Sequence, residues 1–166
     1  MNIKNTLNCL LTLKRTDFEI IALIILTSSL ALFNAVIAPW AVMGYFSAVF
    51  IFSIQFWIAY SNRKKNQILA GILILGITAG FLEIFADYFL VNVGSLDYNQ
   101  AGVFLSESPA YMPFAWSVVI FQLGYIGWRI GENIDLWKSS VIVGALSLFY
   151  MGSYEALAFW GNLWSY

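Results

Sequence analysis

The sequence contains no histidine and a single cysteine, Cys9, among its 166 residues. A protein without histidine lacks the commonest ligand for haem iron, zinc and copper, and also the commonest general base. One cysteine excludes an internal disulfide and offers a metal only one thiolate. The composition therefore predicts a protein with no metal site and no cofactor.

Charged residues are scarce as well. They make up 10% of the chain, whereas 61% is hydrophobic, and the mean hydropathy is +0.78. A soluble domain usually has about a quarter of its residues charged, so this chain has too few polar residues to cover a surface that faces water on all sides. The net charge of −1 offers no basic surface to nucleic acid. These properties predict an integral membrane protein that does not bind nucleic acid.

Long apolar segments fill most of the chain, and each is close to the roughly 20 residues that a helix needs to cross a bilayer. They lie near residues 18–38, 41–60, 68–93, 110–130 and 139–163. Pro39 and Trp40 mark the first turn, and the polar stretch SNRKKNQ (61–67) marks the second. We therefore expect an all-α protein with a single transmembrane domain, a bundle of five transmembrane helices.

The basic residues predict the orientation of this bundle. All eight lysines and arginines precede the first segment or lie around the connections that follow the second and fourth segments. With five spans, these positions share one face of the membrane, and the connections on the other face contain no lysine or arginine. Because basic residues concentrate on the cytoplasmic side, we expect a cytoplasmic N-terminus, an external C-terminus and a location in the cell membrane.

The third segment contains two carboxyl groups. In GFLEIFADYFLVNVG (80–94), Glu83 and Asp87 lie one helical turn apart. At 1.5 Å per residue, Glu83, Glu155 of the fifth segment and Asn34 of the first all lie roughly 22–24 Å from the cytoplasmic end of their helices. A carboxyl inside a membrane is costly and usually faces the bundle interior or a wet cavity. We therefore expect three helices to bring these residues together around a pocket in the outer half of the bilayer.

A second unusual stretch is SESPAYMPFAW (106–116), whose two prolines delay or kink the start of the fourth helix. Its Tyr111 and Trp116 would then approach the carboxyl groups, and Tyr154 precedes Glu155 directly. Aromatic rings of this kind can line a pocket and stabilise a cation. The predicted ligand-binding residues are Asn34, Tyr111, Trp116 and Tyr154, and the predicted catalytic carboxyls are Glu83, Asp87 and Glu155.

The expected spans offer these carboxyls no basic partner. Each must therefore be protonated, hydrogen-bonded, shared as an acid pair or matched by an external cation. A purely structural reading is also open, in which Glu83 forms a hydrogen bond between helices, as asparagine and glutamine often do in membranes.

The size, the five expected spans and the aromatic content of 18% resemble those of the tryptophan-rich sensory protein (translocator) family, which binds porphyrins and sterols. The stretch PFAWSVVIFQLGYIGW (113–128) falls in the fourth segment, however, whereas the proline- and tryptophan-rich signature of that family comes earlier. Intramembrane carboxyls beside aromatic rings also resemble those of integral-membrane terpene cyclases and sterol isomerases. That resemblance is one of chemistry without a shared motif, and no family assignment follows.

Three functions are compatible with these features. The first is a protein that binds, and as an enzyme transforms by acid–base chemistry, a lipidic or isoprenoid-like small molecule, as a cyclase or an isomerase does. The second is a subunit that captures or transports its substrate coupled to protons, sodium ions or an amine. The third is a non-catalytic accessory subunit of an oligomer or larger membrane complex.

Overall fold

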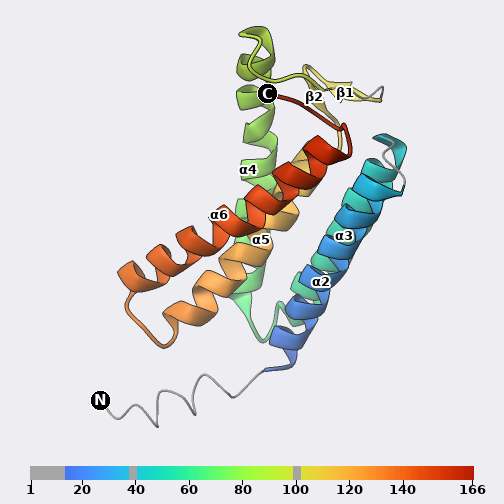
Figure 1. The fold of residues 1–166 in the computed structure, drawn as a ribbon. Helices are drawn as coiled ribbons and strands as arrows, with labels where there is room; N and C mark the ends of the chain where they lie inside the picture. The colour runs from blue at the N-terminus through green and yellow to red at the C-terminus, as the bar shows by residue number, and fades with distance from the viewer. Residues whose placement is uncertain (1–13, 38–40, 99–101) are drawn as a thin grey trace.

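The computed structural model describes residues 14–37, 41–98 and 102–166, and this part of the chain is predominantly helical (Figure 1). The helices are α2 (Arg15–Val36), α3 (Ala41–Asn62), α4 (Gln67–Asn92), α5 (Met112–Gly131) and α6 (Leu136–Trp160). Their bounds lie close to the five predicted segments, and the predicted helical class is confirmed. Cys9 and the expected turn at Pro39 and Trp40 lie outside the described residues.

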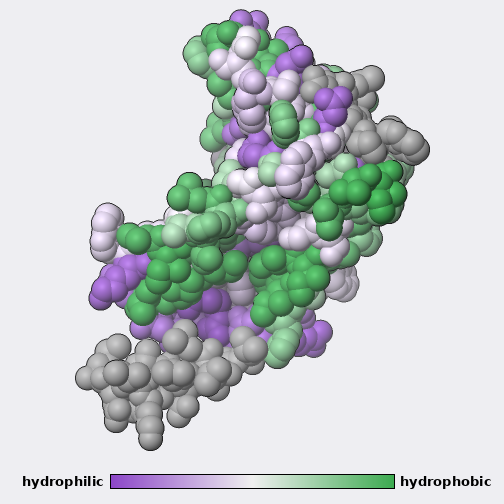
Figure 2. Space-filling view, in the orientation of Figure 1, coloured by the Kyte–Doolittle hydropathy of each residue, from purple (hydrophilic) through white to green (hydrophobic). Residues whose placement is uncertain are grey.

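Four of these helices, α2, α3, α4 and α6, are long and apolar enough to cross a membrane. Large apolar side chains cover much of the outer surface, with Phe85, Trp137 and Phe149 each more than 70% exposed. Figure 2 shows apolar residues spread over a broad part of the visible face. A surface of this kind would be unstable in water and is stable against lipid, so the fold is that of a membrane protein.

Helix α5 is not one of those four and is the helix most enclosed by the others. It contacts α2, α3, α4 and α6, and Phe121 and Gln122 at its centre are fully buried. Pro113 lies in its first turn, where the missing backbone N–H of proline costs no helical hydrogen bond. The polar residues of α5 therefore face other helices rather than lipid.

Two of the helices begin at side-chain caps in short polar turns. The Asn66 side chain accepts a hydrogen bond from the backbone N–H of Ile68 at the start of α4. The Asp135 carboxylate accepts one from the backbone N–H of Lys138 at the start of α6. These caps satisfy backbone donors that would otherwise be unpaired, so each polar turn reverses the chain between two apolar helices.

Helices α4 and α5 make the closest helix–helix contact, because two glycines of α4 lie against the backbone of α5. A Cβ added at Gly76 would lie 2.8 Å from the carbonyl oxygen of Ser117, and one at Gly80 would lie 2.2 Å from that of Pro113. Only a residue without a side chain permits this approach. The contact places α4 on one side of α5 and leaves the other side of α5 to the remaining helices.

One end of the bundle carries a hairpin and the end of the chain, and we call it the hairpin end (Figure 1). The short strands β1 (Phe104–Leu105) and β2 (Ser108–Pro109) pair antiparallel there. Backbone hydrogen bonds of 2.9 Å run in both directions between Asp97, which follows α4, and Ser165, which follows α6. The segment after α6 is therefore bound to the connection between α4 and the hairpin.

The opposite end, which carries the α3–α4 and α5–α6 turns, is called the turn end. Its main polar contact joins the start of α2 to the end of α5. Arg129 Nε and Nη2 lie 2.7 and 2.8 Å from the two oxygens of Asp17, and Tyr125 donates a further hydrogen bond of 2.6 Å to the same carboxylate. The basic residues that the structure describes all belong to this end, namely Lys14, Arg15, Arg63, Lys64, Lys65, Arg129 and Lys138.

The α4–α5 contact leads to a test of the fold. Gly80→Ala should destabilise the protein by about 1–3 kcal/mol, because the added methyl group overlaps the Pro113 carbonyl and forces the helices apart. Gly71→Ala is the matched control on the same helix, since a Cβ there meets nothing within 4 Å. Thermal unfolding of the detergent-purified variants should show a lower Tm for the first only. Equal Tm values for the two variants would contradict this packing.

Candidate functional site

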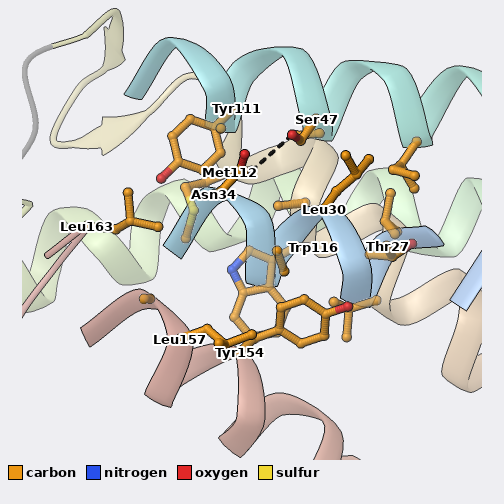
Figure 3. Close-up of a pocket in the computed structure, with 18 of the residues that line it drawn as sticks. Thr27, Leu30, Asn34, Ser47, Tyr111, Met112, Trp116, Tyr154, Leu157 and Leu163 are labelled. Atoms are coloured by element: carbon orange, nitrogen blue, oxygen red, sulfur yellow. Dashed lines mark hydrogen bonds between the residues drawn. The ribbon is translucent and has the colours of Figure 1, made fainter. Parts of the chain in front are cut away.

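A pocket of about 170 Å³ lies between α2, α3, α5 and α6, toward the hairpin end (Figure 3). Its wall is almost entirely apolar. Residues of all four helices and of the segment after α6 contribute to this wall: Leu30, Ala48, Ile51, Val119, Leu157 and Leu163. A concave apolar wall with a few polar groups is the usual form of a small-molecule site.

Small residues keep this space open. Ala31 of α2, Gly44 and Ala48 of α3, and Ala115 of α5 all line the pocket. At Gly44 the ring of Tyr111 lies 3.5 Å from the position that a Cβ would take, so a side chain there would lie directly against the ring. The pocket exists because small side chains occupy these positions of closely packed helices.

Aromatic side chains form much of the remaining wall. Figure 3 shows the rings of Tyr111, Trp116 and Tyr154 around the pocket, contributed by the start of α5, by α5 itself and by α6. Tyr111 packs edge-on against Tyr45 of α3, with ring centroids 5.2 Å apart. The Tyr45 hydroxyl donates to the Val103 carbonyl and accepts from the backbone N–H of Ala110 at 3.1 Å. These bonds connect the hairpin to α3 and to the pocket wall.

Asn34 supplies a buried polar group to the pocket. Its side chain is 7% exposed, and Nδ2 donates a hydrogen bond of 2.9 Å to Ser47 Oγ, drawn as a dashed line in Figure 3. Its Oδ1 is buried and has no hydrogen-bond partner within the described part of the chain. Such an acceptor costs about 1–3 kcal/mol if it stays unpaired, so a donor supplied by a bound molecule or by water would stabilise it.

Glu155 lines the pocket beside Tyr154. Its Oε2 accepts two hydrogen bonds of 2.9 Å, from Trp164 Nε1 and from the Tyr166 hydroxyl. Burial, and next the bond to Glu155, raise the pKa of Tyr166 to about 12, so this phenol stays protonated at neutral pH and remains a donor. Two side chains of the segment after α6 therefore hold the Glu155 carboxylate in place.

Glu83 and Asp87 do not line the pocket. Asp87 is 2% exposed and accepts a hydrogen bond of 2.7 Å from the Tyr98 hydroxyl, which stays protonated because burial and this bond raise the pKa of Tyr98. Glu83 is half-buried, has no hydrogen-bond partner among the described residues, and is subject to electrostatic repulsion from Asp87 and Glu155. Both carboxyls lie on α4, which the pocket does not include.

An aromatic contact nevertheless connects Asp87 of α4 to Glu155 of the pocket wall. The ring of Tyr98, which holds Asp87, packs edge-on against the ring of Trp164, which holds Glu155, with centroids 6.1 Å apart. The position of each carboxyl thus depends on the same pair of rings. Both rings lie in irregular segments at the hairpin end.

The structure thus divides the residues predicted for the site into two sets. Those that line the pocket are Asn34, Tyr111, Trp116, Tyr154 and Glu155, and those that lie outside it are Glu83 and Asp87. The helices around the pocket also differ from the expected first, third and fifth, because α3 and α5 take part and α4 does not. The reason is the α4–α5 contact, which places α4 behind α5.

Sequence reasoning also missed a polar network beside the pocket. Tyr154 donates to Tyr150 at 3.3 Å, Tyr150 donates to the side-chain oxygen of Gln122, and Gln122 Nε2 donates to Thr27 Oγ1 at 2.9 Å. This network connects α6, α5 and α2. The spacing of Tyr150 and Tyr154, one helical turn apart, is the only sequence signal for it.

Among the described residues, no group of three or more histidine, cysteine, aspartate or glutamate side chains is arranged to hold a metal ion. A family model described as a domain of unknown function (DUF6989) matches residues 84–166. Searches of curated proteins and of solved structures found no match.

The Tyr98–Asp87 bond can be tested directly. Tyr98→Phe should cost about 1–3 kcal/mol, because it leaves a buried carboxyl without its donor. Tyr88→Phe is the matched control, since this tyrosine lies on α4 and is 53% exposed. The Tm of the purified variants should fall for Tyr98→Phe and stay near that of the unmodified protein for Tyr88→Phe. A Tyr98→Phe protein as stable as the control would show that Asp87 does not need this donor.

Proposed function

The chain belongs to the DUF6989 family, and we propose that it is a membrane protein that binds a hydrophobic small molecule in the pocket between α2, α3, α5 and α6. One observation carries this function: an apolar pocket whose wall contains the carboxyl group of Glu155 and the Asn34 acceptor, which has no hydrogen-bond partner among the described residues. An apolar molecule with one polar group satisfies both parts of such a wall.

The size and the lining of the pocket favour a lipidic or isoprenoid-like ligand. A volume of about 170 Å³ is close to that of an apolar cavity of about 150 Å³ that takes up benzene. It therefore accommodates the polar end and the first part of a longer apolar chain. The rings of Tyr111, Trp116 and Tyr154 offer flat apolar faces to such a chain.

The geometry supports binding more than catalysis. Glu155 is the carboxyl in the pocket wall, and Tyr154 is the neighbouring hydroxyl. Glu83 and Asp87 lie outside the pocket, so acid–base chemistry between these two carboxyls and a bound molecule has no support in this geometry. In the proposed function, Asp87 acts through Tyr98, whose ring supports Trp164 in the pocket wall.

The proposal includes five membrane spans, with α5 as the span enclosed by the others. The described basic residues all lie at the turn end. Because basic residues concentrate on the cytoplasmic side of a membrane, the turn end is the cytoplasmic end in this proposal. The hairpin end and the pocket then belong to the outer half of the cell membrane.

This topology predicts a labelling pattern. With Cys9 replaced by serine, a cysteine at Ser95, between α4 and the hairpin, should react with a membrane-impermeant maleimide in intact cells. A cysteine at Lys64, in the α3–α4 turn, should react only after the cells are permeabilised. Both positions are exposed, so accessibility within the fold does not limit either reaction. The reverse pattern would invert the orientation, and labelling of both positions in intact cells would contradict a cytoplasmic turn end.

Filling the pocket should abolish binding. Ala115→Phe places a ring inside the pocket, whereas Ala145→Phe makes the same change on the exposed face of α6. In lipid nanodiscs titrated with farnesol, an isoprenoid alcohol, the tryptophan fluorescence of the unmodified protein should change, because Trp116 and Trp164 line the pocket. We expect at least a tenfold loss of farnesol affinity for the first variant and less than a twofold change for the second. Equal affinities would show that farnesol binds elsewhere.

A further inference from the structure

Among the residues that the structure describes, those of the hairpin half of the bundle include acidic side chains but no basic ones. Within the described chain its charged residues are Glu83, Asp87, Asp97, Glu107 and Glu155, and every described lysine and arginine lies at the turn end. Like charges along a low-dielectric wall produce a potential that attracts ions of the opposite sign. The pocket therefore lies in the part of the molecule that attracts cations.

The polar groups of the pocket wall also favour a cation. The buried Oδ1 of Asn34 can only accept a hydrogen bond, and it has no donor among the described residues. Glu155 receives both of its hydrogen bonds on Oε2, which leaves Oε1 without a donor from the described chain. The described residues of the pocket wall include no lysine or arginine, so no basic side chain among them pairs with Glu155.

Aromatic rings complete this environment. Tyr111, Trp116, Tyr154 and Trp164 all line the pocket, and the face of an aromatic ring attracts a cation. The Trp164 N–H bonds to Glu155, so this ring and the carboxylate lie at the same place in the wall.

We propose that the hydrophobic molecule bound here carries a protonated primary amine, which donates hydrogen bonds to Asn34 Oδ1 and to Glu155. This inference rests on the proposed function and specifies its ligand. An ammonium group offers three donors and one positive charge, so it satisfies both acceptors and balances the carboxylate. An alcohol offers one donor and no charge, and a quaternary ammonium offers the charge without a donor.

The inference is tested with ligands that share one chain. The protein in phosphatidylcholine nanodiscs is titrated at pH 7 with farnesylamine, farnesol and farnesyltrimethylammonium, and tryptophan fluorescence is corrected for partition into empty nanodiscs. We expect farnesylamine to bind at least tenfold more tightly than either of the others. If farnesol binds as tightly as farnesylamine, the inference that the ligand carries an amine is overturned, and the proposed function is left intact. Equal binding of the two cations would overturn the donor contacts, and no binding of any of the three would overturn the proposed function itself.

A pair of charge variants assigns the preference to Glu155. E155Q should reduce the ratio of farnesylamine to farnesol affinity to less than threefold. E107Q removes the same charge from the same end, at an exposed position of the hairpin turn outside the pocket, and should keep the ratio near that of the unmodified protein. An equal reduction of this ratio in both variants would show that the amine responds to the total negative charge of the hairpin end and not to a contact with Glu155. That result would overturn the role given to Glu155. If E155Q does not fold, the comparison of the three ligands still decides the inference.

The same ammonium group occurs on a free amine and on the headgroup of phosphatidylethanolamine. Nanodiscs that contain this lipid distinguish the two sources, because a lipid that occupies the pocket competes with farnesylamine. A loss of farnesylamine affinity in these nanodiscs identifies the lipid as the source of the amine, and an unchanged affinity identifies a free amine.

Discussion

The close contact between α4 and α5 determines which helices can enclose the pocket. Because Gly76 and Gly80 have no side chains, α4 lies against the backbone of α5 at Pro113 and Ser117. The opposite side of α5 is then available to α3 and α6, and the pocket forms where these helices meet α2. The carboxyls of α4 therefore lie outside this pocket, and Asp87 is paired with Tyr98 instead.

A second constraint is that polar side chains in a membrane must find their partners within the protein. Most of those described here do so across helices. Gln122 bonds to α2 and α6, and Arg129 and Tyr125 of α5 bond to Asp17 of α2. The buried side-chain oxygens without a partner in the described chain are those of Asn34, Gln55 and Ser108. Of these three residues, Asn34 is the one that lines the pocket, which is why it identifies the site.

The helices could be predicted from the sequence because each is a long apolar segment between short polar turns, and hydropathy records both features. Counting residues along the spans also predicted one common depth for Asn34 and Glu155, and both residues line the pocket. Depth, however, does not tell which way a side chain faces or which helices are neighbours. Glu83 has the same predicted depth as Glu155 and still lies on a helix that the pocket excludes.

The hydrogen-bond partners of Asp87 and Glu155 could not be predicted from the sequence for a different reason. Tyr98 lies 11 residues after Asp87, and Trp164 lies 9 residues after Glu155, each in an irregular segment. Both partners lie beyond the end of the helix that carries the carboxyl, so their contacts depend on how the connections fold back. The pairing of Asp97 with Ser165 brings these two segments together, and neither segment predicts that pairing by itself.

The enclosed position of α5 has a consequence for how this protein is made. During synthesis α2, α3 and α4 leave the ribosome before α5, which is not among the four helices that are apolar enough to cross a membrane by length and composition. In the proposed five-span topology, the partners of Gln122 and Arg129 on α2, namely Thr27 and Asp17, are by then already present in the bilayer. Under that topology, insertion of α5 by the translocon would rely on the helices that precede it, and a change that weakens α2 would first reduce the insertion of α5.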